Sequence, residues 1–425
     1  MWYRLKLWFS DPAKNLWVHP TVGALFAMAF SLMAVLGNRY IPDGVVPPIT
    51  TQTLSSLLDI IASSMLAVTI FSLSIMVSAF AAASSGATPR AYKLMVGDNN
   101  TRTAITSFIS AFIYSIIAKV ALSLQYYGEQ GRFVLFISTL IVFAYLIITL
   151  IRWIQTLSQL GTLGNTINKI EASATQALAD YRARPNFGAV HALPDTAPVL
   201  SIYSPLTGYL THIDFACLQR LAEACEAHFH VCQYSGKFVD PGTVLLSVHQ
   251  ATLDKERIDS LREQVLGCFV LEHNRSYSND PRFGLLVMSE VAQKAMSAAI
   301  NDPATAITTI NALTRILVDT QPSDLTSGLE YLNLSIEQFD AREFIKPVFA
   351  PIARDSQGNM EINMRLLKCL AIIAKHVPES DIRQAAAQEA RELVARAVGS
   401  FSFAADQQQL REVYAEQFPE WDMAH

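Results

Sequence analysis

Long stretches without charged residues dominate the first part of the chain. Four runs contain no Lys, Arg, Asp or Glu: residues 15–38, 60–89, 103–118 and 133–151. A helix needs roughly 20 apolar residues to cross a hydrocarbon core. The runs therefore predict four transmembrane helices, near residues 19–37, 54–83, 104–124 and 132–154.

A change of charge near residue 155 predicts the end of this membrane domain. The 155 residues up to Gln155 carry 10 Lys/Arg and 5 Asp/Glu, whereas the remaining 270 carry 22 and 32. The whole chain is only 16% charged, against roughly 25% in soluble proteins, which argues against a purely soluble enzyme. Its net charge of -5 offers no basic field for nucleic acid. The four predicted spans make the lipid bilayer the expected partner.

The distribution of Lys and Arg predicts that both termini are cytoplasmic. With a cytoplasmic N-terminus, the outer loops hold only Arg39 and Arg132. The inner segments then hold Arg4, Lys6, Lys14, Arg90, Lys93, Arg102, Arg152 and Lys169. This bias follows the positive-inside rule. All five cysteines lie after residue 155, which agrees with a reducing compartment for the second half.

The second hydrophobic segment carries small, weakly polar residues on one face of the predicted helix. This serine stripe comprises Ser56, Ser63, Ala67, Ser74, Ser78, Ala81 and Ser85. Small residues let helices approach closely in lipid, whereas hydroxyl groups also suit the wall of a hydrated path. Both interpretations stay open, because a helix that packs around the axis of a homo-oligomer satisfies both.

Asp59 and Lys119 are the ionisable residues nearest to membrane depth. Such residues usually face a bundle interior or water. Asp59 comes early in its span and Lys119 late in the next, so both lie near the outer ends of their helices and can reach the interface. An ion pair between them is therefore a further expectation.

The second half is predicted to be a cytoplasmic α+β domain. Helical spacing over residues 156–184 predicts an amphipathic continuation of the fourth span, followed by a linker up to residue 198. Strand patterns at 199–203, 208–214 and 244–248 flank a helix capped by Asp214, and they define a small β module over 199–250. Segments 204–210 and 236–245 are similar to the two halves of a biotinyl/lipoyl-like barrel sandwich, without the hairpin that would hold a modified lysine.

These patterns together predict the domain organisation. A four-helix transmembrane domain spans 1–155, a helix and linker span 156–198, the β module spans 199–250, and a mainly helical region spans 251–425. The fold class is thus a membrane α-helical protein with four transmembrane helices and a cytoplasmic α+β domain.

One cluster of the β module has the residue types of a metal site. His228, His230 and Cys232 would share one face of a strand, and such side chains bind zinc. No Cys-x-x-Cys pair or second His pair accompanies them, so an ordinary edge strand is the simpler interpretation. The chain also lacks Walker and Rossmann fingerprints, and we expect no cofactor.

A corner between two predicted helices lies at Asn301-Asp302-Pro303. Asp302 is placed to cap the second helix, with Pro303 at its first position. A helix N-terminus can also receive an anion, but the Asp302 carboxylate would occupy that place itself. Arg275, Asp280 and Arg282 are candidates to join the corner in one polar cluster.

Two sets of motifs, one in each half, resemble those of a known family. The first set is Ser84 to Arg90, then Asp98 and the run from Ser107-Phe108 to Phe112-Ile113-Tyr114. The second set is Arg275, Asp280, Phe283, Gly284 and the run from Met296 to Ala306. They resemble the domain of unknown function 2254, a family of bacterial membrane proteins, although Gly86, Ala87, Thr88 and Ala298 depart from its commoner residues. The resemblance implies a shared fold, a bacterial inner membrane and a family-motif polar cluster of Arg90, Asp98, Arg275, Asp280, Asn301 and Asp302, but no activity.

Three classes of function fit these observations. The first is an oligomeric channel or transport protein, in which the serine stripe lines the path and the cytoplasmic domain regulates it. The second is a membrane-anchored sensor or scaffold whose cytoplasmic domain binds a partner or small ligand. An enzyme is the third and least favoured, because only Arg275, Asp280, Asn301 and Asp302 offer a candidate site.

Overall fold

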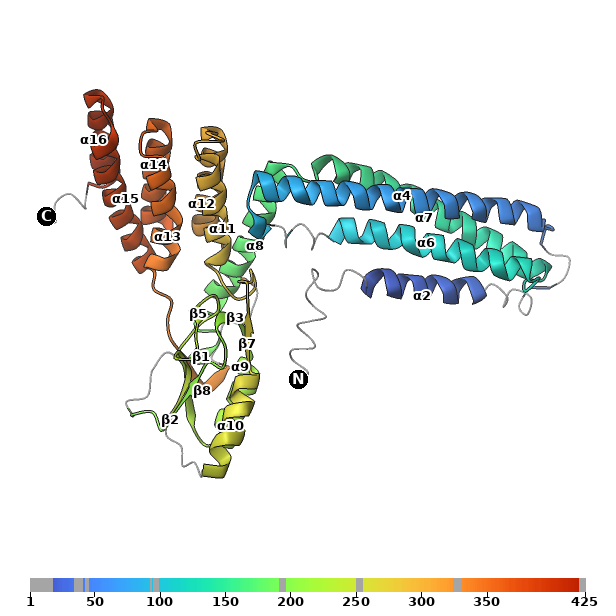
Figure 1. Ribbon diagram of the computed structural model, residues 1–425, viewed down its shortest axis with the longest axis horizontal. Coiled ribbons are helices and arrows are strands. Elements are labelled where there is room, and N and C mark those ends of the chain that lie inside the picture. Colours follow the sequence, from blue (N-terminus) through green and yellow to red (C-terminus); the bar gives the residue numbers. More distant parts are fainter. Residues whose placement is uncertain are drawn as a thin grey trace. The chain divides into compact units, whose positions relative to one another are not determined.

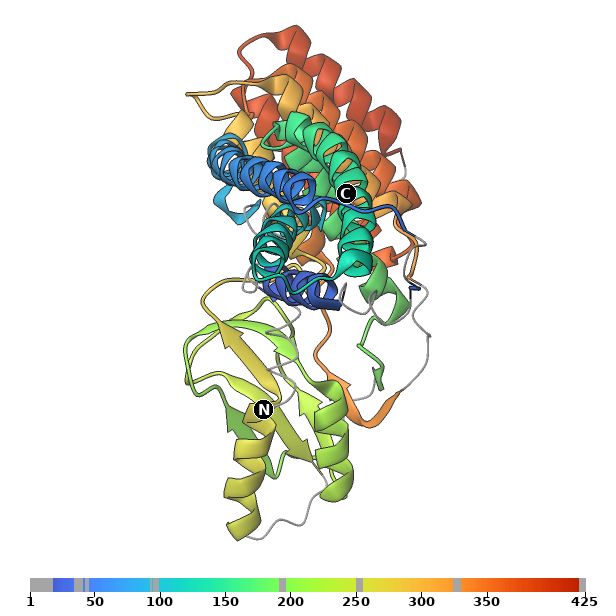
Figure 2. The same ribbon diagram turned by 90° about the vertical axis from the view of Figure 1, so that its right-hand side faces the viewer.

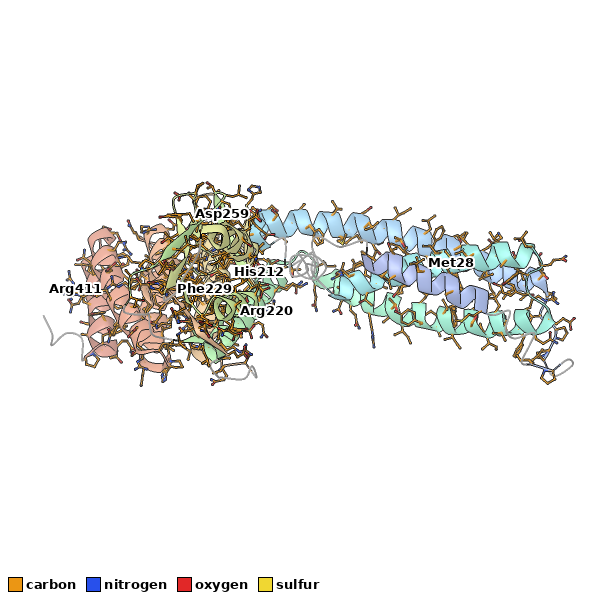
Figure 3. All side chains as sticks on the ribbon, turned by 90° about the horizontal axis from the view of Figure 1, so that it is seen from below. Met28, His212, Arg220, Phe229, Asp259 and Arg411 are labelled. Carbon is orange, nitrogen blue, oxygen red and sulfur yellow. The ribbon has the colours of Figure 1, made fainter. Side chains whose placement is uncertain are left out.

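The computed structural model describes residues 18–33, 41–42, 46–91, 94, 99–190, 196–249, 255–323 and 330–419. The chain forms two compact units that divide after Thr166. The N-terminal unit contains the helices α2 (Val18–Met33), α4 (Thr51–Gly86), α6 (Asn99–Ser123) and α7 (Glu129–Gln159), which run side by side in Figure 1. Figure 3 labels Met28 on α2.

Three of these helices, α4, α6 and α7, are long and apolar enough to cross a membrane among the residues described. They confirm the second, third and fourth predicted spans. The first predicted span is not confirmed, because α2 has 16 residues, fewer than the roughly 20 that a hydrocarbon core requires. The rest of that span, residues 34–37, lies outside the described residues.

Polar contacts between helices join the apolar packing of the N-terminal unit. The indole Nε1 of Trp153 on α7 donates to Ser72 Oγ on α4 at 2.7 Å. The hydroxyl of Tyr114 on α6 lies 3.0 Å from both Ser138 Oγ and Thr139 Oγ1 on α7. In lipid such bonds help to fix helix contacts, because the apolar surroundings favour association only weakly.

The fourth span does not continue into the next helix as predicted. The helix α7 ends at Gln159, and a separate helix α8 spans Leu163–Ala183. Leu160 has extended backbone and Gly161 has φ +78, a conformation that glycine adopts without strain. The break at these residues therefore makes the prediction of one continuous helix wrong.

The C-terminal unit contains a β module of two sheets. A mixed five-stranded sheet has the order β1-β8-β4-β6-β2, and a three-stranded antiparallel sheet has the order β5-β3-β7. The strands are β1 (Ala189–Val190), β2 (Leu200–Tyr203), β3 (Gly208–Ile213), β4 (His228–Val231), β5 (Phe238–Val239), β6 (Val244–His249), β7 (Phe269–Glu272) and β8 (Tyr331–Ile336). Helices α9 (Phe215–Ala224) and α10 (Lys255–Gly267) lie beside the strands (Figure 2).

The β module differs from its prediction in three respects. The strands β7 and β8 come from outside residues 199–250, and β8 interrupts a region predicted to be helical. The strand β4 lies between β6 and β8, so the prediction of an edge strand is wrong. One mixed sheet and one antiparallel sheet do not confirm a barrel sandwich. The predicted cap of α9 is confirmed, since Asp214 Oδ1 accepts from Cys217 N at 2.9 Å.

The core of the β module lies between its sheets and helices. Phe229 on β4, labelled in Figure 3, is completely buried, and Phe269 on β7 is 2% exposed. The remaining helices of the unit are α11 (Phe283–Ala295), α12 (Pro303–Asp319), α13 (Arg342–Asp355), α14 (Met360–His376), α15 (Ser380–Ser400) and α16 (Ala404–Gln417).

A buried arginine ties three helices of the C-terminal unit together. Arg182 on α8 is 4% exposed and forms two hydrogen bonds, of 2.8 and 3.0 Å, to the Glu379 carboxylate that precedes α15. It also donates to the carbonyls of Leu317 and Thr320 at the end of α12. The last carbonyls of a helix have no partner within it, so one guanidinium both caps α12 and neutralises a carboxylate.

Candidate functional site

The serine stripe faces away from the helices that pack against α4. On a helical wheel it lies opposite the buried residues Leu54, Leu58, Ile61 and Met65. Every member of the stripe is exposed within the described part of the chain. The stripe therefore does not pack against α6 or α7. Any protein that packs against it must come from outside this set of helices.

Three hydroxyls in the middle of the stripe are bonded to carbonyls of their own helix. Ser63 Oγ donates to Asp59 O at 2.8 Å, Ser74 Oγ to Ile70 O at 3.0 Å, and Ser78 Oγ to Ser74 O at 3.1 Å. Each donor is thereby satisfied, while the oxygen lone pairs stay open to a further donor. This arrangement is compatible both with a helix contact in lipid and with water.

Asp59 and Lys119 form the expected ion pair. Lys119 Nζ on α6 lies 2.5 Å from Asp59 Oδ1 on α4, and the two side chains are 40% and 52% exposed. The pair links two apolar helices near one end, and it leaves no isolated charge at that position.

In the second motif set, Arg275, Asp280 and Arg282 form a buried ion network. Asp280 is 1% exposed and accepts from Arg275 Nη2 at 2.5 Å and from Arg282 Nε at 3.3 Å. Arg282 also donates to Ser235 O at 2.9 Å and lies over the ring of Tyr234, 4.6 Å from its centroid. The cluster thus joins the chain before α11 to the turn before β5.

The network extends to α13 through Glu343. Its carboxylate accepts from Arg282, from Lys237 Nζ at 2.7 Å and from the Tyr234 hydroxyl at 3.1 Å. Burial opposes the charge of Glu343, but the hydrogen bond from Lys237 and the nearby Arg282 outweigh it and lower the pKa of that carboxyl. Because the ionised groups are paired with one another, we assign the network a structural role.

The Asn301-Asp302 corner is not part of this network. Asp280 precedes the first residue of α11, whereas Asn301 follows the last, and 13 helical residues separate them by about 20 Å. The prediction of one polar cluster is therefore wrong. Asp302 caps α12 as predicted, accepting from Thr305 N at 3.1 Å and from Thr305 Oγ1 at 2.5 Å. These bonds lower the pKa of the Asp302 carboxyl.

The two remaining residues of the family-motif polar cluster lie in the N-terminal unit. Arg90 is exposed on a short 3-10 helix, Pro89–Ala91, just after α4. Asp98 lies outside the described residues.

The candidate metal ligands, two on β4 and Cys232 just after it, are bonded to serines. His228 Nε2 and His230 Nδ1 lie 3.0 and 2.9 Å from the same Ser335 Oγ, and Cys232 Sγ lies 3.4 Å from Ser247 Oγ. Burial lowers the pKa of both imidazoles, so the neutral form is favoured. Among the residues that the structure describes, no group of three His, Cys, Asp or Glu side chains could hold a metal ion.

These features define a class of protein: an α-helical membrane protein with several spans and a separate α+β domain. A family model described as "Predicted membrane protein (DUF2254)" matches residues 13–372. The chain belongs to this family, as its motifs indicated. No curated protein and no solved structure matches the chain.

Proposed function

We propose that the protein is an oligomeric channel or transport protein of the bacterial inner membrane. The observation that carries the proposal is the exposed serine stripe on the face of α4 opposite its packed side. In a lone subunit this face would meet lipid, beside the large exposed side chains of Ile70, Phe71 and Val77. Small residues are typical of helix contacts in membranes, so we infer that α4 helices of several subunits converge and that the stripe borders a hydrated path between them.

The proposal includes four spans, with α2 as part of the first. This arrangement places both termini in the cytoplasm and the C-terminal unit there as a regulatory domain, in line with the Lys/Arg bias. A fluorescent protein fused after His425 should be bright in bacteria, and alkaline phosphatase fused there should be inactive. An active phosphatase fusion with a dark fluorescent one would contradict this topology.

The serine stripe supplies the test of the channel itself. Ser74→Phe should block flux of ions or solutes through reconstituted protein while the oligomer survives, because bulk would enter a water-filled space. Cysteines placed at Ser63, Ser74 and Ser78 should react with a charged, membrane-impermeant thiol reagent, since only a hydrated thiol ionises readily. The five native cysteines must first be replaced or shown to be unreactive.

Val77 provides the matched control, because it is 65% exposed on α4 but lies off the stripe. Val77→Phe should leave flux unchanged, and a cysteine at this position should be protected by lipid. Protection of all three stripe cysteines, together with misassembly of Ser74→Phe, would show a tightly packed helix contact and would exclude the channel.

A membrane-anchored sensor or scaffold is the second candidate function. It is favoured by a cavity of about 730 Å³ in the C-terminal unit, beside α13 and α15. If the stripe proves to be a dry helix contact, ligand binding in this cavity would favour a sensor over a scaffold.

A further inference from the structure

The cavity beside α13 and α15 has four acidic residues among the eleven that line it. Its wall includes Phe339, Asp340, Lys346, Asp381, Glu389 and Glu392. The acidic residues of the wall therefore outnumber its two cations, Lys346 and Arg342. Lys346 Nζ is already paired with Glu392 Oε2 at 3.2 Å. Asp340, Asp381 and Glu389 have no ion pair among the described residues, so the cavity has an excess of negative charge.

Glu389 is the exceptional member of this wall. Glu389 is only 2% exposed. Its Oε1 atom has no hydrogen-bond partner among the residues described. A buried carboxylate without a partner is costly, and such groups are normally paired. Within the described chain, nothing satisfies this oxygen, which points to a donor from a ligand.

We propose that this cavity binds a small organic cation, a protonated di- or polyamine, with the Glu389 carboxylate as the buried counter-charge. Ammonium groups carry only donors, which matches the lone pairs of Glu389, Asp340 and Asp381. The methylene stem of such a ligand can lie along Phe339 and Ala385. The volume of about 730 Å³ far exceeds the space of one metal ion, and the described residues offer no group of ligands for a metal.

The charge state of Glu389 links this binding to pH. Burial, followed by the neighbouring Glu392, raises the pKa of Glu389 to about 7, while Arg396, Lys346 and Arg354 oppose the shift. The carboxyl is therefore partly protonated at neutral pH, and an ammonium ion that binds beside it favours the charged form. Amine binding at pH 7 should thus release protons. The inference goes beyond the channel proposal and does not depend on it, since binding is measured directly.

The test is calorimetric titration of the full chain, purified in a nonionic detergent, with spermidine at pH 7. Wild-type protein should show saturable binding, and titrations in two buffers of different ionisation enthalpy should reveal proton release. Glu389→Gln keeps the shape of the side chain and should weaken binding by at least about tenfold, without proton release. Glu361→Gln changes an exposed acid on α14 and should leave both quantities unchanged.

Stability offers a second readout of the same variant. The folded-state pKa of Glu389 lies above its ordinary value of 4.5, so the protonated carboxyl stabilises the fold at low pH and this contribution is lost as pH rises through 7. Glu389→Gln should therefore remain folded and should melt at a higher temperature than wild type at pH 8. If it fails to fold, Asp381→Asn, at an exposed position of the wall, replaces it in the titration and should weaken binding as well.

Three results would overturn the proposal. The first is no saturable binding of spermidine by wild-type protein below millimolar concentration. The second is equal affinity of wild type and Glu389→Gln, or of wild type and Asp381→Asn where that variant is used. The third is saturable binding of Mg²⁺ that excludes spermidine, which would assign the cavity to a metal ion. None of these results depends on flux through the membrane.

Discussion

Replacement of Asp280 by alanine is expected to lower the free energy of unfolding of the C-terminal unit by about 3–5 kcal/mol. The Asp280 carboxylate is 1% exposed and is the shared acceptor of Arg275 and Arg282. Without it, the guanidinium of Arg282, 6% exposed, keeps Glu343 as its only carboxylate partner among the described residues. Loss of one partner from a buried ion pair leaves an uncompensated charge, which costs far more than the pair itself contributes.

Hydrogen exchange of the full chain measures this loss where it occurs. Amides of β3 and α11 should exchange faster in Asp280→Ala, because local opening free energies fall with the lost contacts. Asp259→Ala is the matched control: Asp259 is 84% exposed and pairs with Arg262 at 3.2 Å, so the cost should be about 0–1 kcal/mol. Equal exchange in the two variants would show that the buried network contributes no more than a surface pair.

The membrane helices could be predicted from the sequence because the bilayer imposes one simple rule. Helices long and apolar enough to span a membrane, α4, α6 and α7, appear at three of the four long runs without charge, whereas the run at 15–38 contains the shorter α2. The break between α7 and α8 escaped prediction, since the apolar spacing continues smoothly through Gly161. The structure shows that Gly161 has φ +78 and that a Cβ added there would lie 3.0 Å from Ala79 Cα, so the break requires glycine at this position.

The buried network could be predicted only in part, for a physical reason. Arg275, Asp280 and Arg282 lie close together in sequence and belong to one motif, so their proximity was expected. Lys237 and Glu343 lie far away in sequence on β-module and helical segments, and a local pattern cannot indicate their partners. The same limit applies to β8, which joins the sheet across more than 80 intervening residues after β6.

Glu389 illustrates a different limit of the sequence. The segment around it alternates acidic, basic and alanine residues, a pattern typical of a solvated helix face. The structure instead buries Glu389 against α13 and leaves its Oε1 without a partner in the described chain. Which of several carboxylates becomes buried depends on which helices pack together. The pattern of charges along the sequence does not indicate this.

The second large effect is expected at Gly284, where α11 meets α8. A Cβ added at Gly284 would lie 2.4 Å from Ala174 Cβ and 2.8 Å from Ala174 Cα. Because part of the obstruction is backbone, the two helices must move apart, and Gly284→Ala should cost about 3 kcal/mol, the upper part of the range for overpacking. Alanine has a higher helix propensity than glycine, by about 1 kcal/mol. Any loss of stability in Gly284→Ala must therefore arise from the contact with Ala174.

A double-mutant cycle separates this contact from other effects. Ala174→Gly removes the opposing Cβ, so the combination Gly284→Ala/Ala174→Gly should recover part of the stability that Gly284→Ala loses. Gly399→Ala is the control, because nothing lies within 4 Å of its added Cβ at the end of α15, and it should gain up to about 1 kcal/mol. Thermal unfolding of wild type, Gly284→Ala, Ala174→Gly and the double variant measures the coupling. A stabilising effect of Gly284→Ala equal to that of Gly399→Ala would mean that α8 and α11 are not in tight contact. If the effects of Gly284→Ala and Ala174→Gly simply added in the double variant, the cost of Gly284→Ala would not arise from its contact with Ala174.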